Sequence, residues 1–170
     1  MIETPRLTLR HLTLVDVDAM FVILGDPVAM QYYPRSFTRE DAVEWIERNI
    51  GRYENLGFGL WAIVLKSSGE MIGDCGLSHQ IVEGVPMLEV GYHLQRSYWG
   101  HGYATEAANA CMSYAFSKLE ADEVISLIRP ENTPSRRVAE RNGMRIDRQV
   151  IYAELPHLVY SMKRESYGKT

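Results

Sequence analysis

The sequence predicts an α/β (α+β) fold, in which a mixed, mostly antiparallel central sheet is flanked by helices. Three observations lead to this prediction. Two segments in the first third have apolar residues at helical spacing, short apolar runs separated by turn residues follow, and strand and helix patterns alternate in the last third. The chain has 170 residues. We therefore expect a single domain over residues 1–170, because domains commonly run about 100–200 residues.

The N-terminal third begins with a strand and continues with two helices. Apolar and polar residues alternate from Leu7 to His11, as in a strand with one buried side. Thr13 and Thr38 each stand three residues before an aspartate, which is the spacing of a capping box at a helix start. The first helix should end at Gly25-Asp26-Pro27 and the second near Gly57.

The middle of the chain predicts three strands joined by tight turns. Residues 60–65 (LWAIVL) form a short apolar run typical of a buried strand. The turn residues 66–69 separate it from a second strand over Met71–Leu77. Glu83-Gly84 marks a further turn before a third strand over Met87–Leu94. This order is that of antiparallel hairpins.

The last third predicts a helix after Gly102, a strand, a helix after Asn132 or Thr133, and two final strands. Pro134 suits the start of the second helix, because the first turn does not need its missing N–H group. Asn142-Gly143 should end that helix. The strands should cover 124–128, 145–152 and 157–163, and the buried face of the first helix should contain Ala104, Ala107 or Ala108, Cys111 and Ala115.

Composition argues against several classes of function. Eighteen basic and 22 acidic residues give a formal charge of −4, so no domain-wide positive field exists to bind nucleic acid. No apolar run approaches the roughly 20 residues that span a bilayer, and no signal peptide opens the chain. We expect a cytoplasmic protein with two reduced thiols. The five histidines show no ligand spacing, so no metal is expected.

A glycine-bearing loop, Trp99-Gly100-His101-Gly102, joins the predicted strand Met87–Leu94 to the helix that follows. Free N–H groups at a helix start, together with the helix dipole, form an anion site that glycines allow a phosphate to approach. A plain strand-to-helix turn is the alternative for the two glycines alone. No Lys follows either glycine, which excludes a P-loop, and Thr105 stands where a dinucleotide fingerprint has Gly or Ala.

The segment Trp99-Gly100-His101-Gly102-Tyr103-Ala104 resembles motif A (Q/R-x-x-G-x-G/A) of the GNAT family of N-acetyltransferases. Trp99 stands where that motif has Gln or Arg. The similarity extends over roughly residues 4–165. It is strongest to the branch that acetylates the N-termini of ribosomal proteins. The segments that carry it are TPRLTLRHLTLVDVDAMF near the start, YWGHGYATEA in the middle, and NTPS followed by RVAERNGM. The resemblance implies the acyl-CoA N-acyltransferase fold.

The resemblance also implies an activity: transfer of an acetyl group from acetyl-CoA, as co-substrate, to a primary amine. The amine would attack directly in a ternary complex. The acceptor would be a ribosomal-protein N-terminus or a small amine, with no nucleic acid or membrane involved, and the enzyme would be a monomer or a homodimer. The alternative is a non-catalytic module of the same fold that binds acyl-CoA or a partner protein.

The resemblance implies two sets of residues for binding acetyl-CoA. Backbone N–H groups of the loop and the first helical turn would bind the pyrophosphate. The strand before the loop would pair with the amide-like pantetheine arm, as in β-augmentation. Asn132 would hydrogen-bond the pantetheine or cap the following helix, two compatible roles. Arg137 would bind a phosphate or remain a solvated charge of the helix surface. The loop residues are Gly100, His101, Gly102, Tyr103, Ala104 and Thr105, and the strand residues are Tyr92, His93 and Leu94.

The expected catalytic groups are Ser135 and Glu89. Many members of the family protonate the departing thiolate with a tyrosine seven residues after the asparagine, but that position is Ala139 here. The ribosomal-protein branch suggests Ser135 as the substitute. Glu89 would deprotonate the incoming ammonium or, equally well, form an edge-strand ion pair. The resemblance implies that Tyr32 and Tyr33 form part of the acceptor pocket wall, and a place in the core is the alternative.

Overall fold

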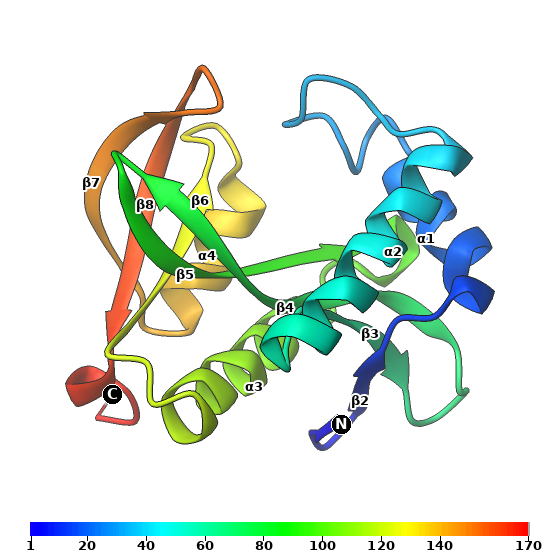
Figure 1. Ribbon diagram of the computed structural model, residues 1–170, viewed down its shortest axis with the longest axis horizontal. Helices are drawn as coiled ribbons and strands as arrows, with labels where there is room; N and C mark the ends of the chain where they lie inside the picture. The colour runs from blue at the N-terminus through cyan, green and yellow to red at the C-terminus, as the bar shows by residue number, and fades with distance from the viewer. Residues whose placement is uncertain (170) are drawn as a thin grey trace.

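The computed structural model describes residues 1–169, which build one mixed sheet (Figure 1). The strand order is β1-β2-β3-β4-β5-β6-β8-β7. Neighbouring strands run antiparallel except for β5 and β6. The predicted fold class is therefore confirmed. The strands are β1 (Ile2–Glu3), β2 (Leu7–His11), β3 (Leu60–Leu65), β4 (Met71–Val82), β5 (Val85–Leu94), β6 (Glu123–Ile128), β7 (Arg145–Tyr152) and β8 (Leu155–Lys163).

Four α-helices flank this sheet in residues 1–169, at the positions that the sequence predicts. Thr38 caps α2 with both bonds of a capping box, and Gly57 ends it in the left-handed region at φ 78°. After Thr13 the chain first makes a short 3₁₀ turn, Leu14–Asp16, and then enters α1. The helices are α1 (Val17–Leu24), α2 (Arg39–Leu56), α3 (Tyr103–Lys118) and α4 (Thr133–Arg141).

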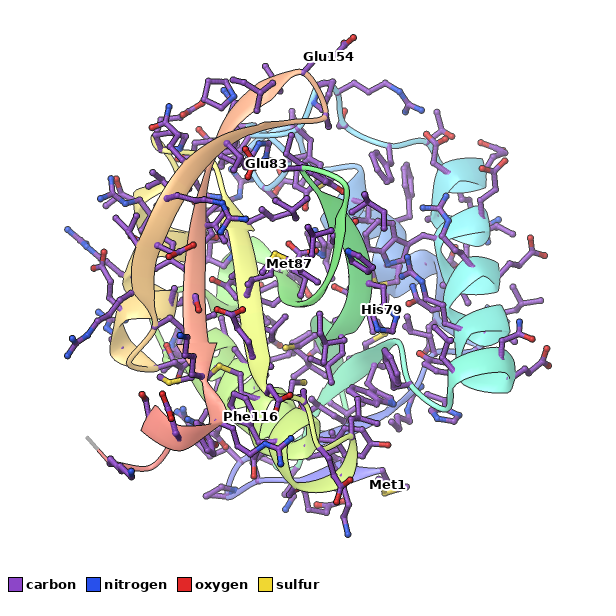
Figure 2. All side chains as sticks on the ribbon, turned by 60° about the vertical axis from the view of Figure 1, so that its left-hand side comes forward. Met1, His79, Glu83, Met87, Phe116 and Glu154 are labelled. Carbon is purple, nitrogen blue, oxygen red and sulfur yellow. The ribbon has the colours of Figure 1, made fainter. Side chains whose placement is uncertain are left out.

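The β4–β5 hairpin is longer than predicted. The expected strands stopped at Leu77 and resumed at Met87, whereas the structure pairs them as far as Val82 and Val85. The turn residues Glu83 and Gly84 both have positive φ, 50° and 82°, as a two-residue type I′ turn requires. Backbone pairing continues through polar residues, which is why the apolar pattern ended too early. The β7–β8 hairpin likewise closes at Ala153-Glu154, at the same end of the sheet (Figure 2).

Helices cover both faces of the sheet, and each face has its own core. Cys111 and Ala115 of α3 pack with sheet residues such as Ile63 and Val90. On the opposite face, α1 and α2 pack over Ala62 and Met71, among others. Of the residues predicted for the buried face of α3, Ala104 is only partly buried, because it lies in the first turn at the sheet edge, whereas Ala107, Ala108, Cys111 and Ala115 are buried.

The sheet opens between β5 and β6. Strand β5 pairs with β4 along its whole length, but its pairing with β6 is restricted to Glu89 opposite Ile125. Beyond that point the two parallel strands diverge, and β5 runs on toward the glycine loop and α3 (Figure 1). The side of Gly91–Leu94 that faces β6 therefore has no strand partner, and an extended ligand has room to pair with it.

The Asp16 carboxylate links the first helical segment to strand β2 of the sheet. The carboxylate accepts two hydrogen bonds from Arg10, each 2.8 Å long, and one from the Thr13 N–H group. Burial alone would raise the pKa of Asp16, but these bonds outweigh burial and hold it below its usual value. Asp16→Asn should lower the free energy of unfolding by about 2 kcal/mol at neutral pH, as expected for hydrogen bonds to a charged group.

The pH dependence of that loss follows from the sign of the shift. A carboxyl whose pKa is lower in the folded state stabilises the fold above its unfolded pKa of about 3.9, and this stabilisation is lost as the pH falls through the folded value. The difference between wild type and Asp16→Asn should therefore disappear in acid, measured by urea unfolding. Asp18→Asn, which removes an exposed partner of Arg39, is the control and should change little. An equal loss in both variants would contradict the assignment.

Candidate active site

The glycine loop forms an anion-binding cradle at the start of α3. Gly100 and Gly102 have φ values of 79° and 80°, in the left-handed region that favours glycine. A Cβ atom added at Gly100 would meet nothing within 4 Å, so space lies open over the loop. The helix begins its bonding with Glu106 N–H to the Gly102 carbonyl, at 3.0 Å. The N–H groups of residues 103–105 are thus left for a ligand.

Thr105 adds a side chain to this cradle. In residues 1–169, its hydroxyl oxygen and Arg129 Nε are the buried side-chain polar atoms that have no hydrogen-bond partner. A buried hydroxyl without a partner is costly, so an unpaired one beside a glycine loop fits a missing polar ligand. The positive φ of both glycines, the free N–H groups and Thr105 together fit the pyrophosphate of a coenzyme.

The N-terminal segment fastens the cradle from outside. Glu106 accepts hydrogen bonds from the Thr4 hydroxyl, the Arg6 N–H group and Arg6 Nε, the last at 2.7 Å. Arg6 also donates to the His101 carbonyl and lies 4.5 Å over the Tyr103 ring. Burial by itself would raise the pKa of Glu106, but these bonds lower it. Glu106 thus holds the loop in place.

Two side chains of the loop make hydrogen bonds to backbone carbonyl groups. The indole N–H of Trp99 donates to the Leu94 carbonyl at 2.9 Å and so closes the loop onto the end of β5. The imidazole Nδ1 of His101 lies 2.9 Å from the Trp99 carbonyl. Trp99 therefore has a structural use here, at the position where motif A has Gln or Arg.

Neighbouring residues of β5 point to opposite faces of the sheet. Tyr92 shares the α3 face with Val90 and Leu94. Its phenol donates a hydrogen bond of 3.0 Å to the carbonyl of Ser135 in α4, and burial raises the pKa of the phenol. His93 points to the face covered by α2. The predicted strand residues thus offer one continuous backbone edge but side chains on two faces.

Helix α4 brings Asn132 and Ser135 beside Tyr92. Asn132 caps the helix by accepting the Ser135 N–H group at 3.2 Å, whereas the Ser135 hydroxyl has no hydrogen bond within residues 1–169. Arg136 is tied to Tyr160 and the Pro130 carbonyl. Arg137 is exposed and has no ion pair in that part of the chain, so it is the more available of the two for a phosphate.

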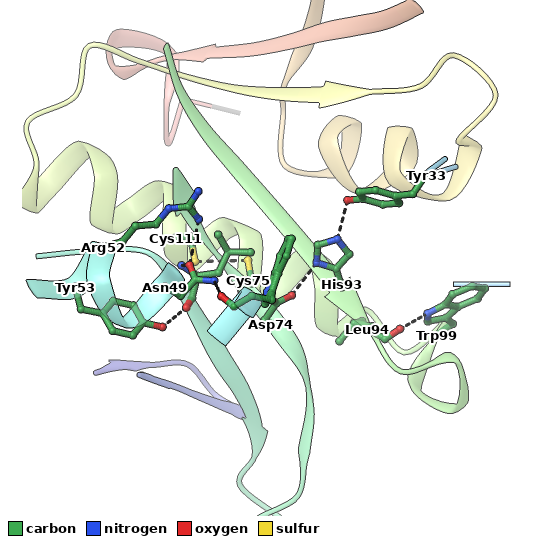
Figure 3. A network of polar contacts seen from close by, with 12 residues as sticks. Tyr33, Asn49, Arg52, Tyr53, Asp74, Cys75, His93, Leu94, Trp99 and Cys111 are labelled. Atoms are coloured by element: carbon green, nitrogen blue, oxygen red, sulfur yellow. Dashed lines mark hydrogen bonds and ion pairs between the residues drawn. The ribbon is translucent and has the colours of Figure 1, made fainter. Parts of the chain in front are cut away.

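On the other face, a partly buried histidine lies between an aspartate and a tyrosine (Figure 3). Asp74 Oδ1 lies 2.8 Å from His93 Nδ1, and His93 Nε2 lies 2.7 Å from the Tyr33 hydroxyl. The other oxygen of Asp74 accepts the Trp45 indole N–H group at 2.8 Å. Tyr33 thus contacts His93, and Tyr32 lies half-buried beside it in the chain; their place in an acceptor wall stays a prediction. Sequence reasoning missed Asp74 and Trp45.

Glu89 lies on the same face as His93, at the point where β5 leaves β6. Its carboxylate accepts hydrogen bonds from Gln80 Nε2 (2.9 Å) and the Leu127 N–H group (3.3 Å), which bridge both neighbouring strands. Burial raises the pKa of Glu89, although the two hydrogen bonds by themselves would lower it. Between the two side chains, a Cβ atom added at Gly91 would meet nothing within 4 Å. The role of Glu89 as a base stays a prediction.

Comparison with known proteins decides the family. The family described as "Acetyltransferase (GNAT) domain" matches residues 6–145. This chain belongs to the GNAT family. The predicted resemblance is confirmed, and the chain is an acetyl-CoA-dependent N-acetyltransferase with acetyl-CoA as its co-substrate.

Relatives of this GNAT chain span nearly its whole length. YkkB of Bacillus subtilis is 36% identical over 97% of this chain and 95% of its own. The structure of a GNAT-family acetyltransferase from Bacillus anthracis is 27% identical, covers 96% of this chain and 98% of its own, and superimposes with a TM-score of 0.83. The ribosomal-protein acetyltransferase RimL, solved with coenzyme A, covers 94% of this chain and 95% of its own, with a TM-score of 0.74. At 20% identity, that likeness is one of fold.

Two further classes of site have no counterpart in the part of this GNAT chain that the structure describes. No group of three or more His, Cys, Asp or Glu side chains among residues 1–169 is placed to hold a metal ion. In the same range, no helix is both long and apolar enough to cross a membrane.

Proposed function

We propose that this acetyltransferase joins acetyl-CoA and a primary amine in a ternary complex, with the amine attacking the thioester directly. The observation that carries the proposal is the divergence of β5 from β6 directly before the glycine loop. The co-substrate supplies an acetyl group activated by its bond to sulfur. The chain supplies an open strand edge with different side chains on its two faces.

Binding of the co-substrate is assigned to the loop, the strand edge and α4. Gly100, His101, Gly102, Tyr103, Ala104 and Thr105 offer the N–H groups and the unpaired hydroxyl for the pyrophosphate. The free edge of Tyr92, His93 and Leu94 suits the pantetheine amides. Asn132 and the exposed Arg137 extend this surface along α4. One backbone N–H group of the strand would bind the developing oxyanion.

The departing thiolate is assigned to Ser135. Its hydroxyl has no other hydrogen bond in residues 1–169, and the carbonyl of the same residue accepts the Tyr92 phenol. This contact brings the Ser135 backbone next to β5 on the α3 and α4 side of the sheet, which supports the assignment. A donor there can share its proton with the sulfur as the acyl bond breaks.

The acceptor is assigned to the opposite face, over Gly91. Tyr33 borders that side through its contact with His93, and Tyr32 precedes it in the chain. A Cβ atom added at Gly91 would meet nothing within 4 Å, which supports a ligand above this residue. The net charge of −4 suits a basic acceptor, such as a ribosomal-protein N-terminus or a polyamine. A monomer or a homodimer is compatible with this arrangement, and a cytoplasmic location remains our prediction.

Release of CoA thiol tests the proposal. The purified protein should release free thiol from acetyl-CoA above the hydrolysis background when the right amine is added, in a screen of N-terminal peptides, polyamines, aminoglycosides and amino acids. Acetyl-CoA at 100 times its Kd should stabilise the protein by about 2.7 kcal/mol, whereas ATP and NAD should not. Stabilisation by acetyl-CoA without thiol release for any amine would favour the non-catalytic module. Stabilisation by ATP or NAD alone would contradict the assignment of the cradle to a coenzyme A ligand.

A further inference from the structure

We propose that Tyr33, His93 and Asp74 form a proton relay that takes a proton from the acceptor ammonium, with Tyr33 as its outer end. The inference rests on the proposed acetyl transfer and assigns the base of that reaction. It differs from the sequence prediction, which gave this role to Glu89 and expected of His93 only a backbone edge for the co-substrate.

The inner end of the relay is fixed and buried. Asp74 has no exposed surface, and its two oxygens bind the His93 ring and the Trp45 indole. Asp74 and His93 stand directly opposite each other in the β4–β5 ladder. The Trp45 ring packs edge-on against the imidazole, with centroids 5.3 Å apart. The imidazole is thus held in one orientation by a strand, a helix and a carboxylate.

The hydrogen bonds define the direction in which a proton can move. An ionised carboxylate only accepts, so His93 Nδ1 must carry the hydrogen that points at Asp74. In the neutral ring, His93 Nε2 then has a lone pair that can accept a hydrogen bond from the Tyr33 hydroxyl, 2.7 Å away. A proton leaving the tyrosine therefore moves inward, to an imidazole whose positive charge Asp74 stabilises. Asp74 acts here as a positioning residue.

The outer end of the relay is open to an acceptor. Tyr33 is 42% exposed, whereas only 10% of the His93 side chain is exposed. Tyr33 comes from the loop between α1 and α2, which the sequence assigns to the acceptor wall. Tyr33 is consequently the residue of these three whose surface an incoming amine can meet.

The proton transfers balance. The ammonium gives one proton to the Tyr33 oxygen while the Tyr33 proton moves to His93 Nε2, and the freed nitrogen lone pair forms the bond to the acyl carbon. The second proton lost by the nitrogen ends on the CoA sulfur, whose bond to the acyl carbon breaks. His93 then returns its proton through Tyr33 to water.

The other charged groups on this side are placed differently. Glu89 lies four residues from His93 on the same strand, roughly 13 Å away along it, since each residue adds about 3.3 Å. Its carboxylate is occupied by β4 and β6. Arg52 of α2 donates to Asn49. The groups that face His93 are thus Asp74 from β4, Tyr33 from the loop, and Glu89 and Arg52 at longer range.

Asp74→Asn is the decisive variant, because it keeps the shape and reverses the hydrogen bonds. The amide oxygen can still accept from Trp45 while the amide nitrogen donates to His93 Nδ1. His93 must then carry its hydrogen on Nε2 and can no longer accept from Tyr33. ¹⁵N imidazole spectra of the protein without ligands should show the Nδ1–H form in wild type and the Nε2–H form in Asp74→Asn. The signal is assigned by its absence in His93→Gln.

The rate of acetyl transfer should depend on which nitrogen of His93 carries the hydrogen. In Asp74→Asn, His93→Gln and Tyr33→Phe, kcat/KM for the acceptor should fall about 10²–10⁴-fold near neutral pH, the range for a positioned base. In all three variants the rate should rise about tenfold per pH unit toward the acceptor's own pKa, about 10.4 for a lysine-like amine, because only free amine then reacts. The KM for acetyl-CoA should change little. His79→Gln, at an exposed histidine of β4, is the matched control and should keep the wild-type pH profile.

The outcomes are distinct. A wild type that releases no thiol with any amine overturns the proposed function and leaves the spectra as the test of the relay geometry. An active wild type whose three variants keep its pH profile overturns the relay. A normal profile in Tyr33→Phe alone also overturns it, since Tyr33 is its outer end. If Glu89→Gln changes the wild-type pH profile of kcat/KM and the three variants do not, the role of base returns to Glu89.

Discussion

Ser135→Ala is expected to lower kcat about 10- to 1,000-fold and to change acetyl-CoA affinity by less than about tenfold. A positioned acid is worth roughly 10²–10⁴-fold, and the effect is reduced here because a thiolate with a pKa of about 8.5 leaves readily. Folding should be unaffected, because the helix cap uses the Ser135 N–H group and the Asn132 side chain, both of which the variant keeps. Stopped-flow turnover with a good acceptor, where chemistry limits the rate, measures the effect.

Thr133→Ala is the matched control, since it removes an exposed hydroxyl from the same helical turn. Ser135→Thr should recover part of the rate. Full turnover by Ser135→Ala would move the acid role to water or to Tyr92, whose phenol already lies against this residue. Tyr160 is a poorer substitute, because its hydroxyl is bound by Arg136 and Glu140. A tyrosine at Ala139 would have to overpack the core, where that residue is 2% exposed.

Gly102→Val is expected to raise the KM for acetyl-CoA about 10- to 150-fold, the equivalent of one or two lost hydrogen bonds to a charged phosphate. The valine side chain would occupy space that the phosphate needs, next to Arg6, whose Nη2 lies 3.5 Å from an added Cβ. The structure also gives a cost in stability. At φ 80° a residue with a Cβ pays about 1–2 kcal/mol, so the fold should be weakened as well.

Gly69→Val separates these two effects. Gly69 has φ 74° and open space around it, and it lies in the β3–β4 turn, outside the residues assigned to the phosphate. The Gly69→Val variant should lose similar stability in a thermal melt and leave the KM for acetyl-CoA unchanged. If Gly69→Val raises the KM as much as Gly102→Val does, the effect comes from the strain, and the phosphate assignment of the loop is wrong.

Much of the fold could be predicted from local patterns. The two capping boxes, the Gly57 stop and the glycine loop before α3 each depend on residues within one turn of chain. Even the Asp74–His93 pair was within reach. A two-residue turn at Glu83-Gly84 sets Val82 opposite Val85, and counting back along both strands sets Asp74 opposite His93. It was missed because the polar residues after Leu77 seemed to end the strand.

Other features depend on contacts that no local pattern encodes. The contact of Tyr33 with His93 joins residues 60 apart, and Arg6 meets Glu106 from 100 residues away. The loop between α1 and α2 has no periodicity from which its path could be derived. The open site likewise depends on where β5 and β6 separate, and these two strands are about 30 residues apart in the sequence, with α3 between them.

The alternation of Tyr92 and His93 on β5 has a consequence for the evolution of specificity. Because adjacent positions of this strand face opposite layers, the groups assigned to the coenzyme and those assigned to the amine share a backbone but few side-chain neighbours. Substitutions in the α1–α2 loop can therefore change the acceptor without disturbing the coenzyme surface. A lineage built on this sheet can diversify its acceptors one loop at a time while its acyl donor stays the same.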